Sequence, residues 1–185
     1  MYVFDPEVLH ECARAGLDLP PEQSFDAVTS ALADHYPEHI STTPRRWVFN
    51  NAGGAMGQLC LLHASLSEYM IFFGSAIGTE GHSGRYIAEV HDFMLSGDMW
   101  CYIQGETDKT VYRPGDHAVL RADQVKGYRL PDAAWMLEYS RGPIPTMLPF
   151  GLADTLLSTL DVFALGYTVY EYGRLTVKSL LRGKI

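Results

Sequence analysis

Two acidic residues in apolar surroundings are the part of this sequence best suited to chemistry. Asp92 lies in RYIAEVHDFMLSG, residues 85–97, and Glu138 lies in AAWMLEYSRG, residues 133–142. In an extended strand successive side chains point to opposite faces, and each acid then shares its face mainly with apolar neighbours. Burying an isolated carboxylate costs on the order of several kcal/mol. Each acid must therefore be solvated, paired or retained for a function.

If the two strands line one interior, Asp92 and Glu138 can share a proton. Two close carboxylates cannot both ionise easily, so the pKa of one rises and the pair titrates jointly. Such a pair offers a neutral acid beside a carboxylate base at neutral pH. It also suits a buried cation with aromatic walls, for which the candidates are Tyr69, Phe73, Tyr102 and Tyr172. The structural alternative is that one or both acids pair with an arginine or a backbone amide.

The other candidate motifs are weaker. His82, His91 and His117 could suggest a metal-binding cupin barrel, but the sequence has no HxH pair and His91 should face away from Asp92. We therefore expect no metal and no other cofactor. The stretch NNAGGAMGQ lacks the GxGxxG order and the lysine of a phosphate-binding loop. The spacing of Gly53 and Gly57 instead predicts close backbone packing, including packing between subunits.

Composition narrows the class of protein. The chain has 185 residues, 47% of them hydrophobic, and a net charge of −8, which excludes a typical nucleic-acid-binding protein. Its three cysteines form no CxxC motif, which predicts reduced, structural thiols. Residues 171–185 hold four basic residues and one acidic residue. This basic end suggests an anionic surface such as a membrane, and an ordinary solvated helix end is the alternative.

Periodicity predicts an α+β protein of one domain, residues 1–185. Helices are expected over 5–18 and 22–36, within an N-terminal part of 1–44. Short strands are expected within 45–142, over these ranges: 58–64, 68–74, 85–95, 99–104, 109–113, 117–120, 125–130 and 134–140. Two apolar helices, 149–160 and 161–181, are expected within 143–185. No secretory signal and no apolar run of about 18 residues is evident.

Two long segments make the chain resemble a known family. WVFNNAGGAMGQLCLLHASLSEYMIFFGSAIGTEGHSGRY, residues 47–86, and WMLEYSRGPIPTMLPFGLADTLLSTLD, residues 135–161, resemble segments shared by fungal-type sterol C-8 isomerases and the sigma-1 receptor. The resemblance implies a cupin-like β-barrel flanked by N-terminal helices, with two C-terminal helices against a membrane. It also implies a homotrimer with the segment of Gly53 and Gly57 at subunit contacts. The implied location is the endoplasmic reticulum membrane. Without a transmembrane helix the protein would be bound peripherally there, and it would be soluble if the anchor is naturally absent.

The resemblance also implies a site. The two buried acids of the family fall on Asp92 and Glu138, and Glu89 is a weaker candidate for the first because it should face away from Asp92. Pocket-lining positions of the family match these residues: Tyr69, Phe73, Val90, Met99, Tyr102, Leu148 and Tyr172.

The activity implied by the isomerase branch is a shift of a sterol double bond from Δ8 to Δ7, in ergosterol-type biosynthesis. A protonated acid gives a proton to C9, a cation forms at C8 and a carboxylate removes a proton from C7. We expect Glu138 to be the anion facing this cation and Asp92 to be its proton-sharing partner. Cationic amphiphilic amines should inhibit. The alternative is a non-catalytic receptor of the sigma-1 type, which binds amines and sterols in the same pocket.

Overall fold

The N-terminal helices form close to where the sequence predicts them. The computed structural model describes residues 2–185. Helix α1 spans Pro6–Arg14, and Asp5 caps it by accepting a hydrogen bond of 2.8 Å from the Glu7 N–H. Helix α2 spans Pro21–His35. The first helix is shorter than the expected 5–18, because its last turn closes at Ala15.

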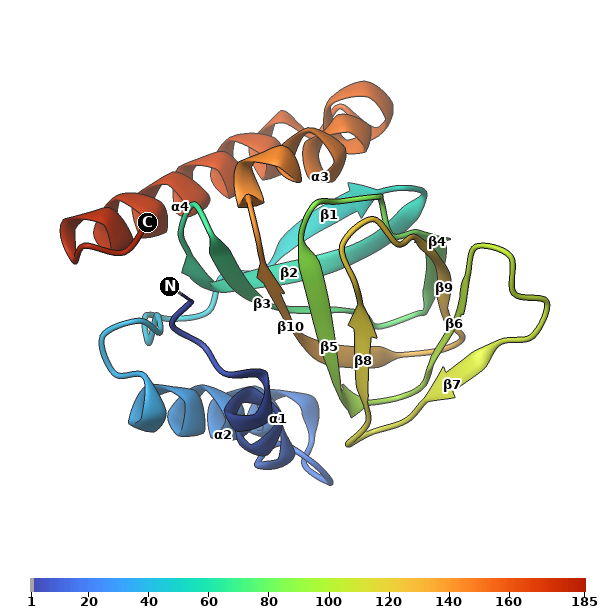
Figure 1. Ribbon diagram of the computed structural model, residues 1–185, viewed down its shortest axis with the longest axis horizontal. Helices are drawn as coiled ribbons and strands as arrows, with labels where there is room; N and C mark the ends of the chain where they lie inside the picture. Colours follow the sequence, from blue (N-terminus) through green and yellow to red (C-terminus); the bar gives the residue numbers. More distant parts are fainter. Residues whose placement is uncertain (1) are drawn as a thin grey trace.

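The strands form two facing antiparallel sheets (Figure 1). The larger sheet contains, in spatial order, β1 (Val48–Ala52), β2 (Ala55–Ala64), β3 (Glu68–Ser75), β10 (Ala134–Arg141), β5 (Glu89–Ser96) and β8 (His117–Leu120). The smaller sheet contains β4 (Thr79–His82), β9 (Lys126–Leu130), β6 (Met99–Ile103) and β7 (Thr110–Tyr112). The expected α+β, cupin-like architecture is therefore present. The strands of residues 2–185 do not close into one hydrogen-bonded barrel, because the two sheets remain separate.

The strands differ from the prediction chiefly at β1, β2, β4 and β5, and β2 begins at Ala55, whereas residue 58 was expected. The short strands β1 and β4 are additional to the expected set. Strand β5 begins at Glu89, whereas residue 85 was expected. The Tyr86 carbonyl accepts a hydrogen bond of 2.8 Å from the Asp123 N–H, and the Arg85 guanidinium donates to the Asp123 carbonyl and to Gln104. These contacts with a loop hold residues 85 and 86 outside the ladder.

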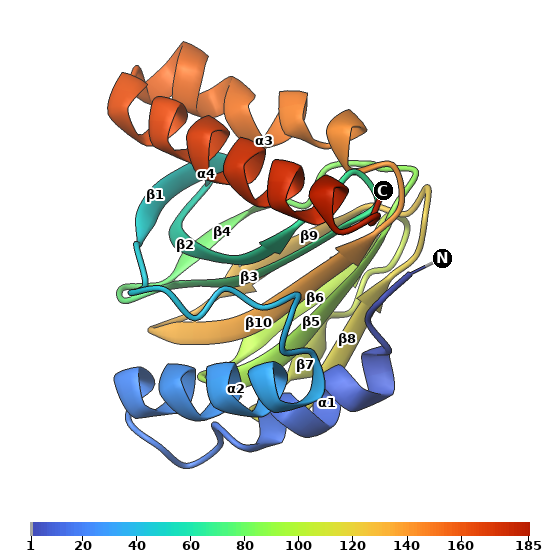
Figure 2. The ribbon, with the colours of Figure 1, turned by 90° about the vertical axis from the view of Figure 1, so that its left-hand side faces the viewer.

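Helices α1 and α2 cover the outer face of the larger sheet, which Figure 2 shows edge-on. Phe25 of α2 packs its ring against Trp47, Phe72 and Trp135 at centroid distances of 5.0, 4.8 and 5.4 Å. Phe93 is fully buried in the same cluster. This face of the sheet is closed by aromatic packing, so any cavity must lie on its other face.

The C-terminal helices lie on the other side of the sheets (Figure 2). A short 3₁₀ turn, Ile144–Thr146, leads into α3, Leu148–Asp154, and a π-helical turn, Thr155–Thr159. Leu160 adopts a left-handed φ of 53°, which ends this segment, and Asp161 caps α4, Val162–Leu181. The two helical segments thus correspond to those expected over 149–160 and 161–181. None of the helices within residues 2–185 is both long enough and apolar enough to cross a bilayer.

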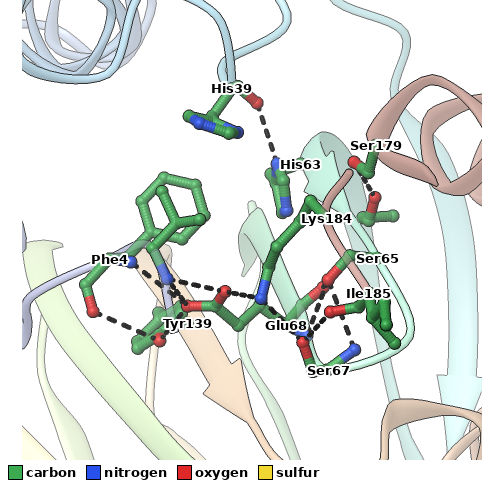
Figure 3. Close-up of polar contacts among 12 residues, drawn as sticks. Phe4, His39, His63, Ser65, Ser67, Glu68, Tyr139, Ser179, Lys184 and Ile185 are labelled. Atoms are coloured by element: carbon green, nitrogen blue, oxygen red, sulfur yellow. Dashed lines mark hydrogen bonds and ion pairs between the residues drawn. The ribbon is translucent and has the colours of Figure 1, made fainter. Parts of the chain in front are cut away.

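A buried glutamate, Glu68, joins the two ends of the chain (Figure 3). Its carboxylate accepts hydrogen bonds from the Val3 N–H at 2.9 Å and the Tyr139 hydroxyl at 2.6 Å, and it forms an ion pair with Lys184 at 2.7 Å. The Phe4 N–H donates to it at 3.2 Å. Burial opposes ionisation, but these donors lower the pKa of Glu68. Lys184, counted in the basic end that suggested a membrane surface or a solvated helix end, is therefore buried inside the protein.

We predict that Glu68→Gln lowers the free energy of unfolding by about 3 kcal/mol near neutral pH. The variant places an NH₂ group among donors and removes the partner of Lys184. Urea unfolding followed by tryptophan fluorescence measures the change. Because the pKa of Glu68 is lowered by folding, its contribution is present above the pKa of an ordinary glutamate and is lost as the pH falls through the folded pKa.

The matched control is Glu80→Gln. Glu80 and Arg129 form an exposed ion pair of 3.7 Å, and such pairs contribute little. An equal loss of stability in the two variants would contradict the structural role of Glu68.

Candidate active site

A deep, mostly apolar cavity lies between the two sheets and is roofed by α3 and α4. Six of the seven expected pocket residues line it: Tyr69, Phe73, Val90, Met99, Leu148 and Tyr172. Further lining residues come from the larger sheet and from the roof: Leu59, Leu61, Ile71, Leu120, Met136, Met147, Phe150, Leu152, Thr168 and Val169. The sequence did not single out this second group, since apolar strand residues look alike whether they line a cavity or fill a core.

Tyr102 is the exception to the predicted pocket. It is 51% exposed and is absent from the cavity wall. Met99 and Tyr102 are three positions apart in β6, so their side chains point to opposite faces. Met99 faces the cavity, whereas the Tyr102 ring lies over the backbone of Gly127. The prediction for Tyr102 is therefore wrong.

Asp92 and Glu138 both face the cavity and lie directly opposite each other. They are register partners on β5 and β10, two interior strands of the larger sheet. The other neighbour of Asp92 in the sheet is Ala118, and that of Glu138 is Ile71. Side chains at such opposed positions have Cβ atoms about 5 Å apart. The strand geometry therefore brings together the two acids that periodicity had singled out.

Glu89 lies on the outer face of β5, as strand alternation predicts. Its carboxylate accepts hydrogen bonds from the Arg141 guanidinium at 2.9 Å and from His91 at 2.8 Å. Although burial favours the neutral acid, these two partners lower the pKa of Glu89. The Glu89 carboxylate is therefore paired with structural partners outside the cavity.

Lys126 is a site residue that sequence reasoning missed. It is the first residue of β9 in the smaller sheet, and its side chain crosses to the larger sheet, where Nζ contacts Oδ2 of Asp92. The two side chains are 8% and 3% exposed. Burial disfavours the ammonium, yet the charge and hydrogen bond of Asp92 raise the pKa of Lys126. Asp92 is thus the partner of a buried cation.

Glu138 has different surroundings from Asp92. The Tyr69 hydroxyl donates a hydrogen bond of 2.5 Å to its Oε1. Burial, followed by the negative charge of Asp92, raises the pKa of Glu138 to about 7, although Tyr69 and Lys126 oppose the shift. Burial and the charge of Glu138 also raise the pKa values of Tyr86 and Tyr128, two further hydroxyls in the wall. Glu138 is therefore the acid that can hold a proton at neutral pH.

The three histidines of the cupin alternative do not share a site. His91 and His117 contact each other at 2.9 Å and stack beside Phe93 on the outer face of the larger sheet. His82 lines the cavity. Burial and the neighbouring ring of His91 lower the pKa of His117 to about 4. Within residues 2–185 no group of three histidine, cysteine or acidic side chains is arranged to hold a metal ion.

The arrangement defines a class of site. A protonated carboxyl group, an ion-paired carboxylate and an apolar wall suit proton exchange with a hydrophobic molecule, because the proton donor and its conjugate base are both shielded from water. The same cavity suits a hydrophobic cation if Glu138 is ionised. The fold and the cavity thus define a cupin-like protein with a buried acid pair.

Comparison with known proteins identifies the family. A family model described as "ERG2 and Sigma1 receptor like protein" matches residues 1–184, and the chain belongs to this family. A C-8 sterol isomerase from Neurospora crassa is 43% identical over 99% of this chain and 73% of its own length. The protein named erg2 homolog from Dictyostelium discoideum is 42% identical over 96% of this chain and 76% of its own length.

The other branch of the family is about equally similar. The sigma non-opioid intracellular receptor 1 of Gallus gallus is 44% identical over 92% of this chain and 78% of its own length. Among solved structures, an RmlC-like cupin from Shewanella frigidimarina aligns with a TM-score of 0.47 and 16% identity, over 57% of this chain and 90% of that one. Identity alone therefore does not separate the isomerase branch from the receptor branch.

We predict that the Glu138 carboxyl group titrates near neutral pH and that Tyr69→Phe moves this titration upward. The Tyr69 hydroxyl stabilises the ionised form of Glu138, so its removal favours the proton. Infrared spectra of protein with ¹³C-labelled glutamate would follow the carboxylic C=O band, with Glu138→Gln to assign it. A band that titrates like an ordinary glutamate, or a downward shift in Tyr69→Phe, would contradict the assignment.

Proposed function

We propose that this protein is a sterol isomerase that moves a double bond from the Δ8 to the Δ7 position. The observation that carries the proposal is the pairing, in an apolar cavity, of a protonatable Glu138 with Asp92, whose carboxyl group contacts the Lys126 ammonium. An alkene is a very weak base, so its protonation needs an acid held in its neutral form away from water. The relatives named C-8 sterol isomerase support the same reaction.

In the proposed reaction Glu138 donates its proton. The O–H bond of Glu138 breaks, C9 gains the proton and the electrons of the Δ8 bond form the new C–H bond, which leaves a cation at C8. The Glu138 carboxylate that remains stabilises this cation. A C7–H bond then breaks, its electrons form the Δ7 bond and the proton passes to a carboxylate. No net proton or electron is gained or lost.

This assignment adds the proton donor, which the sequence left open, to the expected roles of the two acids. From the resemblance, Glu138 was expected to be the anion and Asp92 its proton-sharing partner. The ion pair with Lys126 favours the carboxylate form of Asp92, and the surroundings of Glu138 favour its neutral form. We therefore assign the proton to Glu138 and the resting negative charge to Asp92.

The second candidate function is a non-catalytic receptor for cationic amines and sterols. The sigma-1 relatives favour it, and the same cavity serves both functions. A cationic amphiphilic amine resembles the carbocation, so it should inhibit the enzyme as well as bind a receptor. Turnover, and not amine binding, separates the two.

We predict that the purified protein converts a Δ8-sterol in D₂O into a Δ7-sterol that carries one deuterium. Glu138→Gln cannot release a proton and should lower kcat by about 10²–10⁴-fold. Mass spectrometry of the products measures both effects. Glu89→Gln is the matched control, because Glu89 lies outside the cavity. Tight amine binding without any Δ7 product would favour the receptor, and a fully active Glu138→Gln would contradict the assigned role.

We also propose that α4 and the turn before it lie against a membrane surface. Two polar residues of α4, Ser179 and Tyr172, face the protein and donate hydrogen bonds to the carbonyls of Ala64 and Ser65, respectively. The outward side is apolar, with exposed residues that include Leu156, Leu157, Leu160, Val162, Phe163, Val169, Val177, Leu180 and Leu181. An exposed apolar stripe of this size is typical of an interfacial helix.

We predict that the triple variant Leu157→Ser, Phe163→Ser and Leu181→Ser binds phosphatidylcholine vesicles at least about tenfold more weakly. These side chains are 79%, 87% and 84% exposed, so their replacement should leave the fold intact. Vesicle flotation measures binding. The control replaces three exposed apolar residues outside the C-terminal helices, Ile77, Ile87 and Val119, by serine. Equal losses in the two triple variants would contradict a membrane role for the helices.

A homotrimer at the endoplasmic reticulum membrane remains part of the proposal. Gly53 has a φ of +61°, and a Cβ there would lie 2.3 Å from the His82 carbonyl oxygen. At Gly57 a Cβ would lie 2.7 Å from the Gly74 carbonyl oxygen. Packing within one chain thus already requires both glycines. Support for a subunit contact at this hairpin comes instead from its exposed apolar residues, Phe49 and Met56.

A further inference from the structure

We propose that Lys126 determines the specificity of this site. By holding Asp92 as a carboxylate, its ammonium leaves the mobile proton on Glu138 and gives the resting site no net charge. Such a site favours a neutral alkene over a cationic amine. The part of the inference that concerns turnover rests on the proposed isomerase function. Amine affinity tests the inference without turnover.

Among residues 2–185, Asp92 is the one ionic partner of Lys126. Its Nζ contacts Oδ2 of Asp92 and lies 3.9 Å from the Met99 sulfur, which is a weak acceptor. The backbone of Lys126 is fixed by Ser83, which accepts its N–H and donates to its carbonyl, each at 3.0 Å. The ammonium is therefore aimed between the sheets at Asp92 and is shielded from solvent.

The charges around the pair can be counted from every strand that packs against it. The titratable groups that face Lys126, Asp92 or Glu138 are Tyr69 on β3, Tyr86 in the loop before β5, Asp92 on β5, Cys101 on β6, Tyr112 on β7, Tyr128 on β9 and Glu138 on β10. His82 on β4 also lines the cavity, and its Nδ1 accepts a hydrogen bond of 2.9 Å from the Gly84 N–H. Burial raises the pKa values of the four tyrosines and of Cys101, so these groups are neutral near pH 7. The resting site then holds one cation and one anion, and it has no net charge in the molecules in which Glu138 carries its proton.

A cationic ligand and an alkene require opposite protonation states of Glu138. An ammonium group in the cavity would meet the charge of Lys126 and would need Glu138 to lose its proton. The alkene needs that proton in place. Lys126 therefore opposes capture of the cation and supports protonation of the neutral substrate.

Replacing Lys126 by methionine separates these effects. Asp92 and Glu138 then face each other without a cation, so they share one proton and the site carries one negative charge. We expect the affinity for an amine to rise at least about tenfold, because a nearby positive charge is lost. We expect kcat for the Δ8-sterol to fall by about tenfold or more, because the proton is no longer held on Glu138.

The double variant Lys126→Met with Asp92→Asn tests whether Lys126 acts through Asp92. It removes both charges and leaves Glu138 as an isolated buried acid, which stays protonated. Its amine affinity should therefore return to within a few fold of the wild-type value. Lys109→Met is the matched control, because Lys109 is exposed and stacks on Trp100. It should change neither affinity nor turnover.

Calorimetric titration with N,N-dimethyl-4-phenylbutylamine measures affinity, and formation of the Δ7-sterol in D₂O measures turnover. Tighter amine binding by a slower Lys126→Met enzyme, reversed for the amine in the double variant, supports the proposal. Loss of both properties, or an unchanged amine affinity, overturns it. If the wild-type protein has no turnover, the isomerase function fails, and the amine affinities of the two variants still decide the role of Lys126. If the Lys126→Met protein does not fold, the double variant provides the test. An amine affinity of the double variant far above that of the wild type would overturn the charge assignment.

Discussion

Two carboxylates that face each other on adjacent interior strands are the constraint on which the site depends. Like charges directly opposite in a sheet repel, and burial makes each more costly. The protein meets this constraint with groups from different elements. Lys126 of the smaller sheet neutralises Asp92, a proton neutralises Glu138, and Tyr69 of β3 fixes the Glu138 carboxyl group. The site therefore exists only when both sheets are in place.

A second buried glutamate on the same sheet shows what distinguishes a structural acid from a reactive one. Glu68 is fully buried and is surrounded by donors from both ends of the chain, so its charge is satisfied and its pKa is lowered. Within residues 2–185, Glu138 receives a hydrogen bond from Tyr69 alone, and its pKa is raised. A buried acid with few donors and an open cavity in front of it is available for proton transfer. Glu68 is not.

Strand alternation was enough to predict which faces Asp92, Glu138 and Glu89 occupy, because a period of two depends only on the local backbone. The same period places Lys126 with Tyr128 and Leu130 on the inward face of β9, so a signal existed. It was missed because a lysine at the start of a strand is usually solvated, and its pairing with Asp92 depends on contact between two sheets. The strand β4 was missed for a similar reason, since four residues that include a glycine give a weak local signal and the strand forms by pairing with β9. Lys184 looked like part of a basic tail until the fold brought it to Glu68.

The raised pKa of Glu138 makes it a weaker acid but increases the fraction of molecules in which it carries a proton. A glutamate with an ordinary pKa of about 4.3 would be protonated in only about one molecule in 500 near pH 7. With a pKa of about 7, half of the molecules carry the proton. The acid is intrinsically weaker, and the carboxylate that it leaves behind is correspondingly better able to stabilise a cation in an apolar cavity. This advantage lasts only while water is excluded, because water would both lower the pKa and screen the ion pair. The apolar roof formed by α3 and α4 is therefore as necessary to the chemistry as the acids beneath it.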